Sequence, residues 1–180
     1  MLVEREPETS HAIGEANVMA IDPALQQALD REYWQTPENG EALEMQTVDY
    51  RSTRDIPLGD VIALYKANGW SAVEKPEALH KALVNSETLI SAWDGEALVG
   101  LGNAISDGHL VVYYPHLIVL PVYHGRGVGR EIMRRLRQRY ESFHQHMLVA
   151  EATAVPFYER MGFVRAGQTV PMWIYAGDDH

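Results

Sequence analysis

The chain has 180 residues, of which 46% are hydrophobic and 22% charged, and its formal net charge is -10 at pH 7. This length and composition predict one globular domain with a full hydrophobic core. The absence of cysteine excludes disulfides, thiolate metal ligands and a cysteine nucleophile. No apolar run approaches the roughly 20 residues needed to cross a bilayer, and the N-terminal sequence does not resemble a signal peptide. We therefore expect a cytoplasmic protein without a membrane partner.

The negative charge is concentrated at the N-terminus. Residues 1–45 contain ten acidic and two basic side chains, a net charge of -8, so the other 135 residues carry only -2 of the total -10. We predict an acidic N-terminal extension over residues 1–45 and a folded domain over residues 46–180. Within the extension, Asp22 as N-cap and Pro23 as first helical residue predict one short helix. A solvated arm and a docked helix both remain open for this segment.

The folded domain begins with one strand and two helices. Residues 45–53 alternate as a strand does, whereas residues 58–70 have helical spacing of apolar residues and stop at Gly69. Residues 76–86 predict a second helix that Pro76 opens. This part of the chain therefore indicates a mixed α/β domain.

A three-stranded antiparallel meander follows. Residues 88–93, the turn Asp94-Gly95 and residues 96–105 predict a hairpin, since a tight turn demands positive φ angles that Asp-Gly supplies. A second turn over residues 106–108 leads into a long strand over residues 109–120. The expected fold class is therefore α/β with a mixed, mostly antiparallel central sheet flanked by helices.

A glycine-rich loop, HGRGVG at residues 124–129, comes directly after the third strand of the meander. Beyond it, apolar residues from Val128 to Phe143 recur every three or four positions, which predicts a helix. This order of strand, loop and helix directs the first N–H groups of the helix and its positive dipole end into the loop, and glycine allows an anion to approach closely. The pattern predicts phosphate binding.

The spacing excludes two common phosphate-binding motifs. A nucleoside-triphosphate P-loop needs Gly-Lys followed by Ser or Thr, whereas Arg130 follows Gly129. The dinucleotide pattern GxGxxG would need a third glycine at residue 130, and its loop follows the first strand of an alternating α/β unit. Taken alone, the loop is also compatible with a simple turn between a strand and a helix.

The sequence after this helix supplies a second motif. Residues 146–150 predict a short apolar strand, and Thr153 is expected to cap a helix that ends at Gly162, with Phe163 folding back on it. LIVLPVYHGRGVG resembles the cofactor-binding motif of the GNAT superfamily of N-acetyltransferases, and FYERMGF resembles that superfamily's second signature. The two motifs have the family's order and separation, and the resemblance extends from about Met45 to Tyr175.

The resemblance implies a GNAT-type fold and acetyl-CoA as cosubstrate. Two strands of that fold splay apart at the cofactor site, where the backbone at Leu117, Ile118 and Val119 would bond the acetyl carbonyl and the pantetheine arm. The backbone of the glycine loop and the residue after it would bind the pyrophosphate, which assigns His124, Gly125, Arg126, Gly127, Val128, Gly129 and Arg130. His124 departs from the family's usual Gln or Arg, a small change where most contacts are made by backbone N–H groups.

The catalytic residues are expected on and before the second signature. Tyr158 matches the family's usual proton donor to the departing thiolate, although a tyrosine in an amphipathic helix can also serve only the core. An alkylamine titrates near ~10.4, so a base or a water chain must deprotonate it before it attacks the thioester. Seven residues before the tyrosine, where many relatives have Asn, this chain has Glu151.

A narrower resemblance supports Glu151 as the base or as a member of a water relay. LYKANGW, PEALHKALVNS, SDG and MWIY are similar to a plastid and cyanobacterial branch that includes plant arylalkylamine (serotonin-type) acetyltransferases. In that branch the residue at this position is acidic and is a proposed base. A solvated carboxylate remains the alternative reading of Glu151. Three residues are kept as reserve candidates for the base: Asp107, Tyr114 and His116.

The predicted function is direct transfer of an acetyl group from acetyl-CoA to a primary amine of a small molecule, with an arylalkylamine as one candidate. Protein lysine or N-terminal acetylation and a noncatalytic acyl-CoA-binding module remain alternatives. The aromatic residues that could form an amine pocket, or belong to the core, are Trp70, Trp93, Tyr113, Tyr114 and Trp173. The six arginines between residues 126 and 139 are interpreted as the polar face of a helix, not as a nucleic-acid site. His144 and His146 lack a third ligand, so no metal is assigned, and a homodimer is open.

Overall fold

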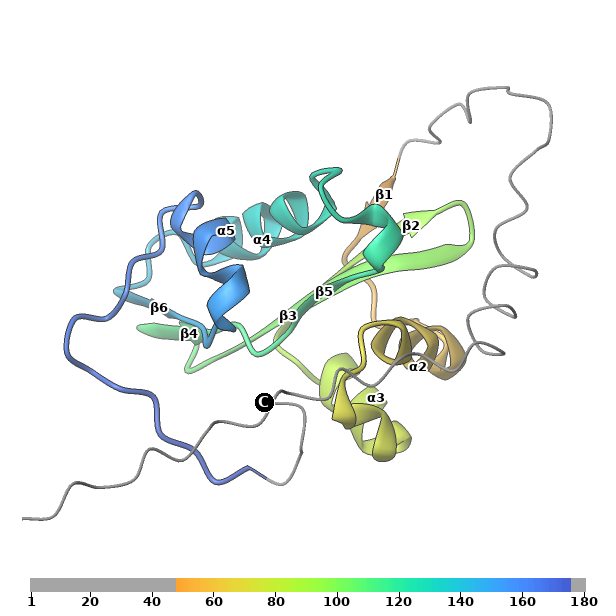
Figure 1. Cartoon of the computed structure of the whole chain (residues 1–180), viewed down its shortest axis with the longest axis horizontal. Coiled ribbons are helices and arrows are strands. Elements are labelled where there is room, and N and C mark those ends of the chain that lie inside the picture. Colours follow the sequence, from red (N-terminus) through yellow and green to blue (C-terminus); the bar gives the residue numbers. More distant parts are fainter. Residues whose placement is uncertain (1–47, 176–180) are drawn as a thin grey trace, which may run out of the picture. The chain divides into compact units, whose positions relative to one another are not determined.

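The computed structural model describes residues 48–175, in which a mixed sheet lies between two layers of helices (Figure 1). The predicted acidic extension over residues 1–45 and its helix lie outside the described residues. The strands are β1 (Asp49–Arg51), β2 (Thr88–Asp94), β3 (Ala97–Ser106), β4 (Val111–Tyr113), β5 (Leu117–Val119) and β6 (Gln145–Met147). The helices are α2 (Leu58–Ala67), α3 (Pro76–Val84), α4 (Val128–Arg139) and α5 (Val155–Glu159), with 3-10 turns at Ser71–Glu74, Pro121–Tyr123 and Ala152–Ala154.

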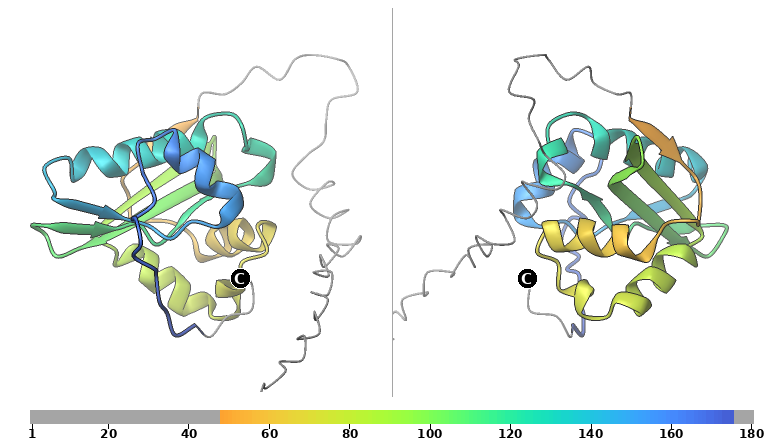
Figure 2. Two further views of the ribbon diagram at one scale, coloured as in Figure 1. Left: turned by 60° about the vertical axis from the view of Figure 1, so that its left-hand side comes forward. Right: turned by 90° about the vertical axis from the view of Figure 1, so that its right-hand side faces the viewer.

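The sheet has the order β1-β2-β3-β4-β6, and β5 also pairs with β3. All pairs are antiparallel except that of β4 with β6, so the predicted mixed, mostly antiparallel sheet is confirmed. Helices α2 and α3 cover one face, and α4 and α5 lie on the other, as the three views show together (Figures 1 and 2). No helix within residues 48–175 combines the length and apolar character needed to cross a membrane.

Both helical layers form because one face of each helix is apolar. Helix α2 buries Val61, Leu64 and Tyr65, and α4 buries Val128, Ile132, Met133 and Leu136. Within each set, successive residues are one, three or four positions apart, which is the spacing of one helix face and places them on the side that meets the sheet. The predicted helix start at Pro76 is confirmed, and Gly69, with a φ of 69°, follows the end of α2 as predicted.

The hairpin of β2 and β3 is confirmed, but its turn differs from the prediction. Asp94 is the last residue of β2 and pairs with Ala97, so the turn consists of Gly95 and Glu96. Gly95 has a φ of 61°, and no non-glycine residue between 48 and 175 has a positive φ. Asp94 therefore keeps an extended backbone, which leaves its side chain available for another contact.

The predicted single strand over residues 109–120 is wrong in one respect, because it is broken between β4 and β5. The register pairs Ile105 with Tyr113 and Gly102 with Leu117. Two residues of β3 thus face the three residues 114–116 on the other strand, which is a β-bulge. Pro115 lies in the bulge and has no N–H to give to a ladder.

The side chain of Asn103 stabilises this bulge. Its Oδ1 accepts the N–H of His116 at 3.1 Å, while its own backbone N–H donates to the His116 carbonyl at 3.1 Å. The amide Nδ2 donates to Ser86 Oγ at 2.8 Å inside the core. Beyond the bulge β6 pairs only with β4, and β5 only with β3. The predicted splay of two strands is therefore present, and its vertex is the bulge.

The second signature forms α5, although its N-terminus differs from the prediction. Thr153 lies in the 3-10 turn before α5, and no side chain caps the helix. The helix ends at Glu159, three residues before the predicted end. The turn at Gly162 is as predicted: Gly162 has a φ of 87°, and the N–H of Phe163 donates to the Tyr158 carbonyl at 3.1 Å. This closing pattern turns the chain back and brings the ring of Phe163 edge-on to that of Tyr158.

Substituting alanine for Gly102 is expected to lower the free energy of unfolding by about 1–3 kcal/mol, as overpacking a core does. A Cβ at this residue of β3 would lie 2.8 Å from Ile132 Cγ2 and 3.0 Å from Leu136 Cδ1, both on α4. Gly59→Ala is the matched control, because a Cβ added at that helical residue would have nothing within 4 Å; it should be neutral or stabilising by about 0.5–1 kcal/mol. Urea unfolding measures both, and equal stability of the two variants would contradict tight seating of α4 on β3.

Candidate active site

The open edge of β5 forms one side of the candidate site. The Asn103 N–H donates to the His116 carbonyl, and the Leu120 N–H to the Val99 carbonyl at 2.9 Å. Bonds to one antiparallel neighbour recur at every second residue. Ile118 therefore directs its backbone groups to β3, whereas Leu117 and Val119 direct theirs to the edge that no described strand covers. All three predicted strand residues lie in β5, and two of them, Leu117 and Val119, direct their backbone N–H and C=O groups to the uncovered edge.

The glycine loop forms the second side, directly before α4. Gly125 and Gly127 have φ angles of 76° and 86°, a region that side chains with a Cβ rarely adopt. Five backbone N–H groups in and after the loop have no hydrogen-bond partner within residues 48–175. They belong to Gly125, Gly127, Val128, Gly129 and Arg130. Because the positive end of the α4 dipole adds to these donors, the loop is suited to bind an anion.

Two residues that the sequence reasoning missed hold the loop in place. The Tyr123 hydroxyl donates to Asp94 Oδ2 at 2.6 Å, which ties the loop to the β2–β3 turn. Burial, followed by the bond to the Asp94 carboxylate, raises the pKa of Tyr123 to about 12, so it remains a donor. The guanidinium of Arg126 lies 5.1 Å from the centre of the Tyr123 ring. The only sequence signal was the Asp-Gly pair, which indicated a turn and not an anchor.

His124 links the two sides. Its Nε2 lies 2.9 Å from the carbonyl oxygen of Val119. Because a carbonyl accepts, Nε2 must carry the hydrogen of this bond. The His124 side chain thus contacts the open edge of β5 directly.

Tyr158 lies on α5 and packs against the hydrophobic cluster that also contains Val128 of α4. The preceding residue, Phe157, has its Cζ 3.6 Å from the place of a Cβ on Gly129, and Val119 Cγ2 is 3.6 Å from the same point. The start of α5, the first turn of α4 and the end of β5 therefore meet. Burial raises the pKa of Tyr158 to about 12, and its hydroxyl bonds to no other group within residues 48–175. This phenol is protonated and available.

The other candidates for proton transfer differ in their surroundings. Glu151 is exposed at the start of the Ala152–Ala154 turn and accepts no hydrogen bond from another described side chain. Asp107 Oδ1 accepts the N–H groups of His109, Leu110 and Val111, and these bonds lower the pKa of its carboxyl to about 2. Asp107 therefore stabilises a turn.

Tyr114 and His116 also make internal bonds. Tyr114 is 3% exposed, and its hydroxyl is 2.8 Å from His146 Nδ1, which makes it a core residue. His116 Nδ1 is 2.6 Å from the Tyr65 hydroxyl. Burial lowers the pKa of His116 to about 4, so the imidazole is neutral at pH 7.

The five aromatic residues considered for an amine pocket do not form one group. Trp93 and Tyr114 are buried in the two hydrophobic clusters. Trp70 is half-buried, with its ring edge-on to that of His116 at 5.5 Å between centroids. Trp173 is exposed and lies 5.4 Å from the Tyr175 ring, whose hydroxyl reaches Ser71 Oγ at 3.2 Å. Tyr113 is half-buried on β4. The C-terminal segment thus extends to the turn after α2, next to Trp70.

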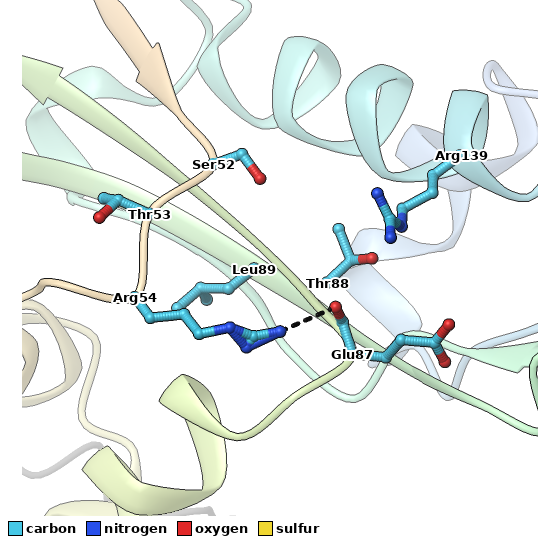
Figure 3. A pocket seen from close by; sticks show the side chains of 7 residues that line it. All are labelled: Ser52, Thr53, Arg54, Glu87, Thr88, Leu89 and Arg139. Atoms are coloured by element: carbon cyan, nitrogen blue, oxygen red, sulfur yellow. Dashed lines mark hydrogen bonds between the residues drawn. The ribbon is translucent and has the colours of Figure 1, made fainter.

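A surface hollow of about 140 Å³ lies elsewhere and contains none of the predicted site residues (Figure 3). It lies between the β1–α2 connection, the start of β2 and Arg139 at the end of α4, at the opposite end of that helix from the glycine loop. In it the Arg54 guanidinium donates to the carbonyls of Val84, Ser86 and Glu87. These bonds satisfy free carbonyls at the end of α3, so Arg54 has a structural role.

The family model that matches this chain and three similar proteins are all named as acetyltransferases. A model of the acetyltransferase (GNAT) domain family matches residues 60–172. "Uncharacterized N-acetyltransferase ycf52" of Pyropia yezoensis is 28% identical over 130 residues, which are 68% of this chain and 74% of that protein. A GNAT-family acetyltransferase from Streptococcus pneumoniae TIGR4 has a solved structure that is 32% identical, with a TM-score of 0.64 over 73% of this chain and 100% of that one. A probable acetyltransferase from meticillin-resistant Staphylococcus aureus is 28% identical, with a TM-score of 0.64 over 72% and 100%.

Proposed function

Because the chain belongs to the acetyltransferase (GNAT) domain family, we propose that it transfers the acetyl group of acetyl-CoA directly to a small primary amine, with arylalkylamines as the first class to test. It is an acetyl-CoA-dependent N-acetyltransferase. The observation that carries the proposal is that five N–H groups at the glycine loop, which have no partner within residues 48–175, lie beside the open edge of β5. The N–H groups of the loop suit a pyrophosphate, and the open strand edge suits an arm that contains amide groups. Acetyl-CoA has both a pyrophosphate and such an arm.

The residues proposed to hold acetyl-CoA are those predicted from the sequence. The backbone from His124 to Arg130 would bind the pyrophosphate, with Gly127 as the N-cap of α4. In Leu117–Val119, the alternation favours Leu117 and Val119 for bonds to the acetyl carbonyl and the pantetheine arm, while Ile118 fixes the strand to β3. The carbonyl of Val119 has a second lone pair, so it can accept a bond from the arm while His124 donates to it.

The proposed reaction needs two proton movements. The amine nitrogen bonds to the acetyl carbon, the C–S bond breaks, the nitrogen loses a proton and the thiolate of CoA is left to be protonated. Glu151 is proposed as the base or as part of a water relay, because an exposed carboxylate can exchange the proton with solvent. Tyr158 is proposed as the donor to sulfur, because its hydroxyl is protonated and has no partner within the described part of the chain.

A small aromatic acceptor is supported by the surroundings of Trp70. This half-buried ring lies beside His116, the residue before β5, and a flat ring can pack against it. The contact of Tyr175 with Ser71 brings the C-terminal segment to the same place. An acceptor bound beside this ring would be limited in size by the C-terminal segment, which favours a small molecule over an extended peptide. The branch of arylalkylamine (serotonin-type) acetyltransferases, cytoplasmic location and a homodimer are parts of this proposal.

The test is release of free CoA from acetyl-CoA, measured with a thiol reagent. The chain has no cysteine, so the protein itself contributes no signal. The acceptors are tryptamine, serotonin, spermidine, single amino acids and a lysine peptide. We expect release that depends on tryptamine or serotonin. Release only with the peptide would replace a small amine by a protein substrate, and CoA binding without release with any acceptor would indicate the noncatalytic module.

A further inference from the structure

The hydrogen bond between Tyr65 and His116 determines which ring nitrogen of His116 carries the proton. Tyr65 is fully buried, and burial raises the pKa of its phenol far above the usual value. The phenol therefore keeps its proton and donates it to Nδ1 of His116 at 2.6 Å. The reverse arrangement, with Nδ1–H as donor, would leave the Tyr65 hydrogen without an acceptor in the core, which is unfavourable. A neutral imidazole with a bare Nδ1 has its hydrogen on Nε2.

This Nε2–H group is accessible. The Nε2–H group of His116 makes no hydrogen bond to any group within residues 48–175. Over the same residues, no buried side-chain nitrogen or oxygen lacks a partner. Nε2 is therefore not among the buried atoms and must reach the surface. His116 thus presents one donor of fixed identity and no acceptor.

The position of this donor is fixed by three contacts. The backbone N–H and the backbone carbonyl of His116 both form hydrogen bonds with Asn103, at the β-bulge where the strands begin to splay apart. The Tyr65 hydroxyl holds the ring on the α2 face of the sheet, and the ring of Trp70 lies edge-on to it at 5.5 Å. The next residue, Leu117, begins the open edge of β5. The donor therefore adjoins the proposed acceptor pocket, on the face opposite to α4.

We propose that His116 is a specificity-determining residue whose Nε2–H donates a hydrogen bond to an oxygen or nitrogen atom in the body of the acceptor, and that it does not deprotonate the amine. This inference rests on the proposed function for the location of the acceptor. Nε2 already carries a hydrogen, so it has no lone pair for the proton of the amine. The substrates selected are amines with a hydrogen-bond acceptor, such as a hydroxyl or methoxy oxygen, away from the reacting nitrogen.

The first experiment reads the tautomer without any turnover. Long-range proton–nitrogen NMR spectra of the protein labelled with ¹⁵N-histidine distinguish a protonated from a bare ring nitrogen, and the His116 signals are assigned by their loss in His116→Gln. We expect hydrogen on Nε2 and a bare Nδ1, and a mixture of tautomers in Tyr65→Phe. Hydrogen on Nδ1 in the wild-type protein would overturn the proposal. This result is independent of whether any amine is acetylated, so it separates the failure of this inference from the failure of the proposed function.

The second experiment uses two substitutions that differ in the donor they keep. The amide nitrogen of glutamine can take the place of Nε2, and that of asparagine the place of Nδ1. With serotonin as acceptor, we expect His116→Asn to raise the acceptor KM about tenfold or more, as loss of a buried hydrogen bond does. His116→Gln should restore most of that affinity, and the KM for acetyl-CoA should not change in either variant. Tryptamine, which lacks the hydroxyl, should show a smaller difference between the two variants.

The alternative outcome is equally distinct. If His116 were the base, both variants would lose kcat by about 100-fold or more, with an unchanged acceptor KM, and glutamine would restore nothing. Glu151→Gln is the comparator for that pattern, because it removes the proposed base and leaves His116 in place. A loss of kcat in both His116 variants that matches the loss in Glu151→Gln would overturn the proposal.

Discussion

The Gly127→Asp variant is expected to lose all protection by CoA against thermal unfolding and to remain folded. Aspartate at this N-cap places a carboxylate beside the five loop N–H groups that have no partner in the described part of the chain, where it takes up donors and repels a pyrophosphate. For the wild-type protein, CoA at 100 times its Kd should stabilise by about 2.7 kcal/mol, which corresponds to a rise in Tm of about 5–10 °C. The variant should show no rise.

A control must separate this effect from backbone strain. Gly127 has a φ of 86°, and Asp is tolerated in this region at a cost of about 1–2 kcal/mol. Gly108→Asp is the matched control, because Gly108 has a φ of 80°, lies in open space, and belongs to the turn before β4. It should show a similar loss of intrinsic stability and a normal response to CoA. If Gly127→Asp still binds CoA as the wild type does, the loop does not hold the pyrophosphate.

Tyr158→Phe should lower kcat about 100-fold and leave the affinity for CoA unchanged. A hydrogen bond to a charged group contributes about 1.5–3 kcal/mol, which equals roughly 10–150-fold in rate. The raised pKa of Tyr158, about 12, lies above that of an ordinary thiol such as cysteine, near ~8.5, so complete transfer of its proton to a thiolate is unfavourable. We therefore expect the phenol to stabilise the developing thiolate mainly by donating a hydrogen bond as the C–S bond breaks.

The same pKa predicts the pH dependence. Because it is raised, the neutral phenol persists as the pH passes through about 10, where an ordinary tyrosine ionises, and it is lost only near pH 12. The wild-type kcat should therefore show no decline from Tyr158 between pH 8 and about 10.

Tyr50→Phe is the control for the Tyr158→Phe substitution. It removes the hydroxyl of another half-buried tyrosine, on β1, whose ring contacts Arg135 on the part of α4 away from the glycine loop. A fully active Tyr158→Phe would transfer the role of donor to another group.

The sequence predicted most of the secondary structure because periodicity and turn residues are local properties. The apolar spacing of α4 and the glycines of the loop lie within one short segment, so the strand-loop-helix unit could be recognised without any tertiary information. The second signature added the position of Tyr158. The mostly antiparallel sheet followed from two turns that the chain marks with glycine at residues 95 and 108.

Most of the features that the sequence did not predict are bonds between residues far apart in the chain, and one is a local turn. The break between β4 and β5 depends on Asn103, whose side chain bonds to the backbone of a residue 13 positions later. Asp94 was interpreted as a turn residue, but its extended backbone leaves the carboxylate to Tyr123, 29 positions later. Thr153 has a good residue type for an N-cap, yet a 3-10 turn occupies its position. The roles of Tyr158 and Glu151 stay predictions until the variants are measured.

The absence of side chains at Gly100 and Gly102 also sets the distance between α4 and the sheet. A Cβ at either residue would lie within 3.2 Å of the Ile132 side chain on α4, so these glycines allow the helix to pack close to β3. The glycine loop is fixed to the end of that helix, and β5 is fixed to the same two glycines by its register. In the proposed site, one acetyl-CoA molecule would have to bind the loop with its pyrophosphate and β5 with its pantetheine arm. The spacing that β3 imposes between α4 and β5 would then decide whether both groups can bind at the same time.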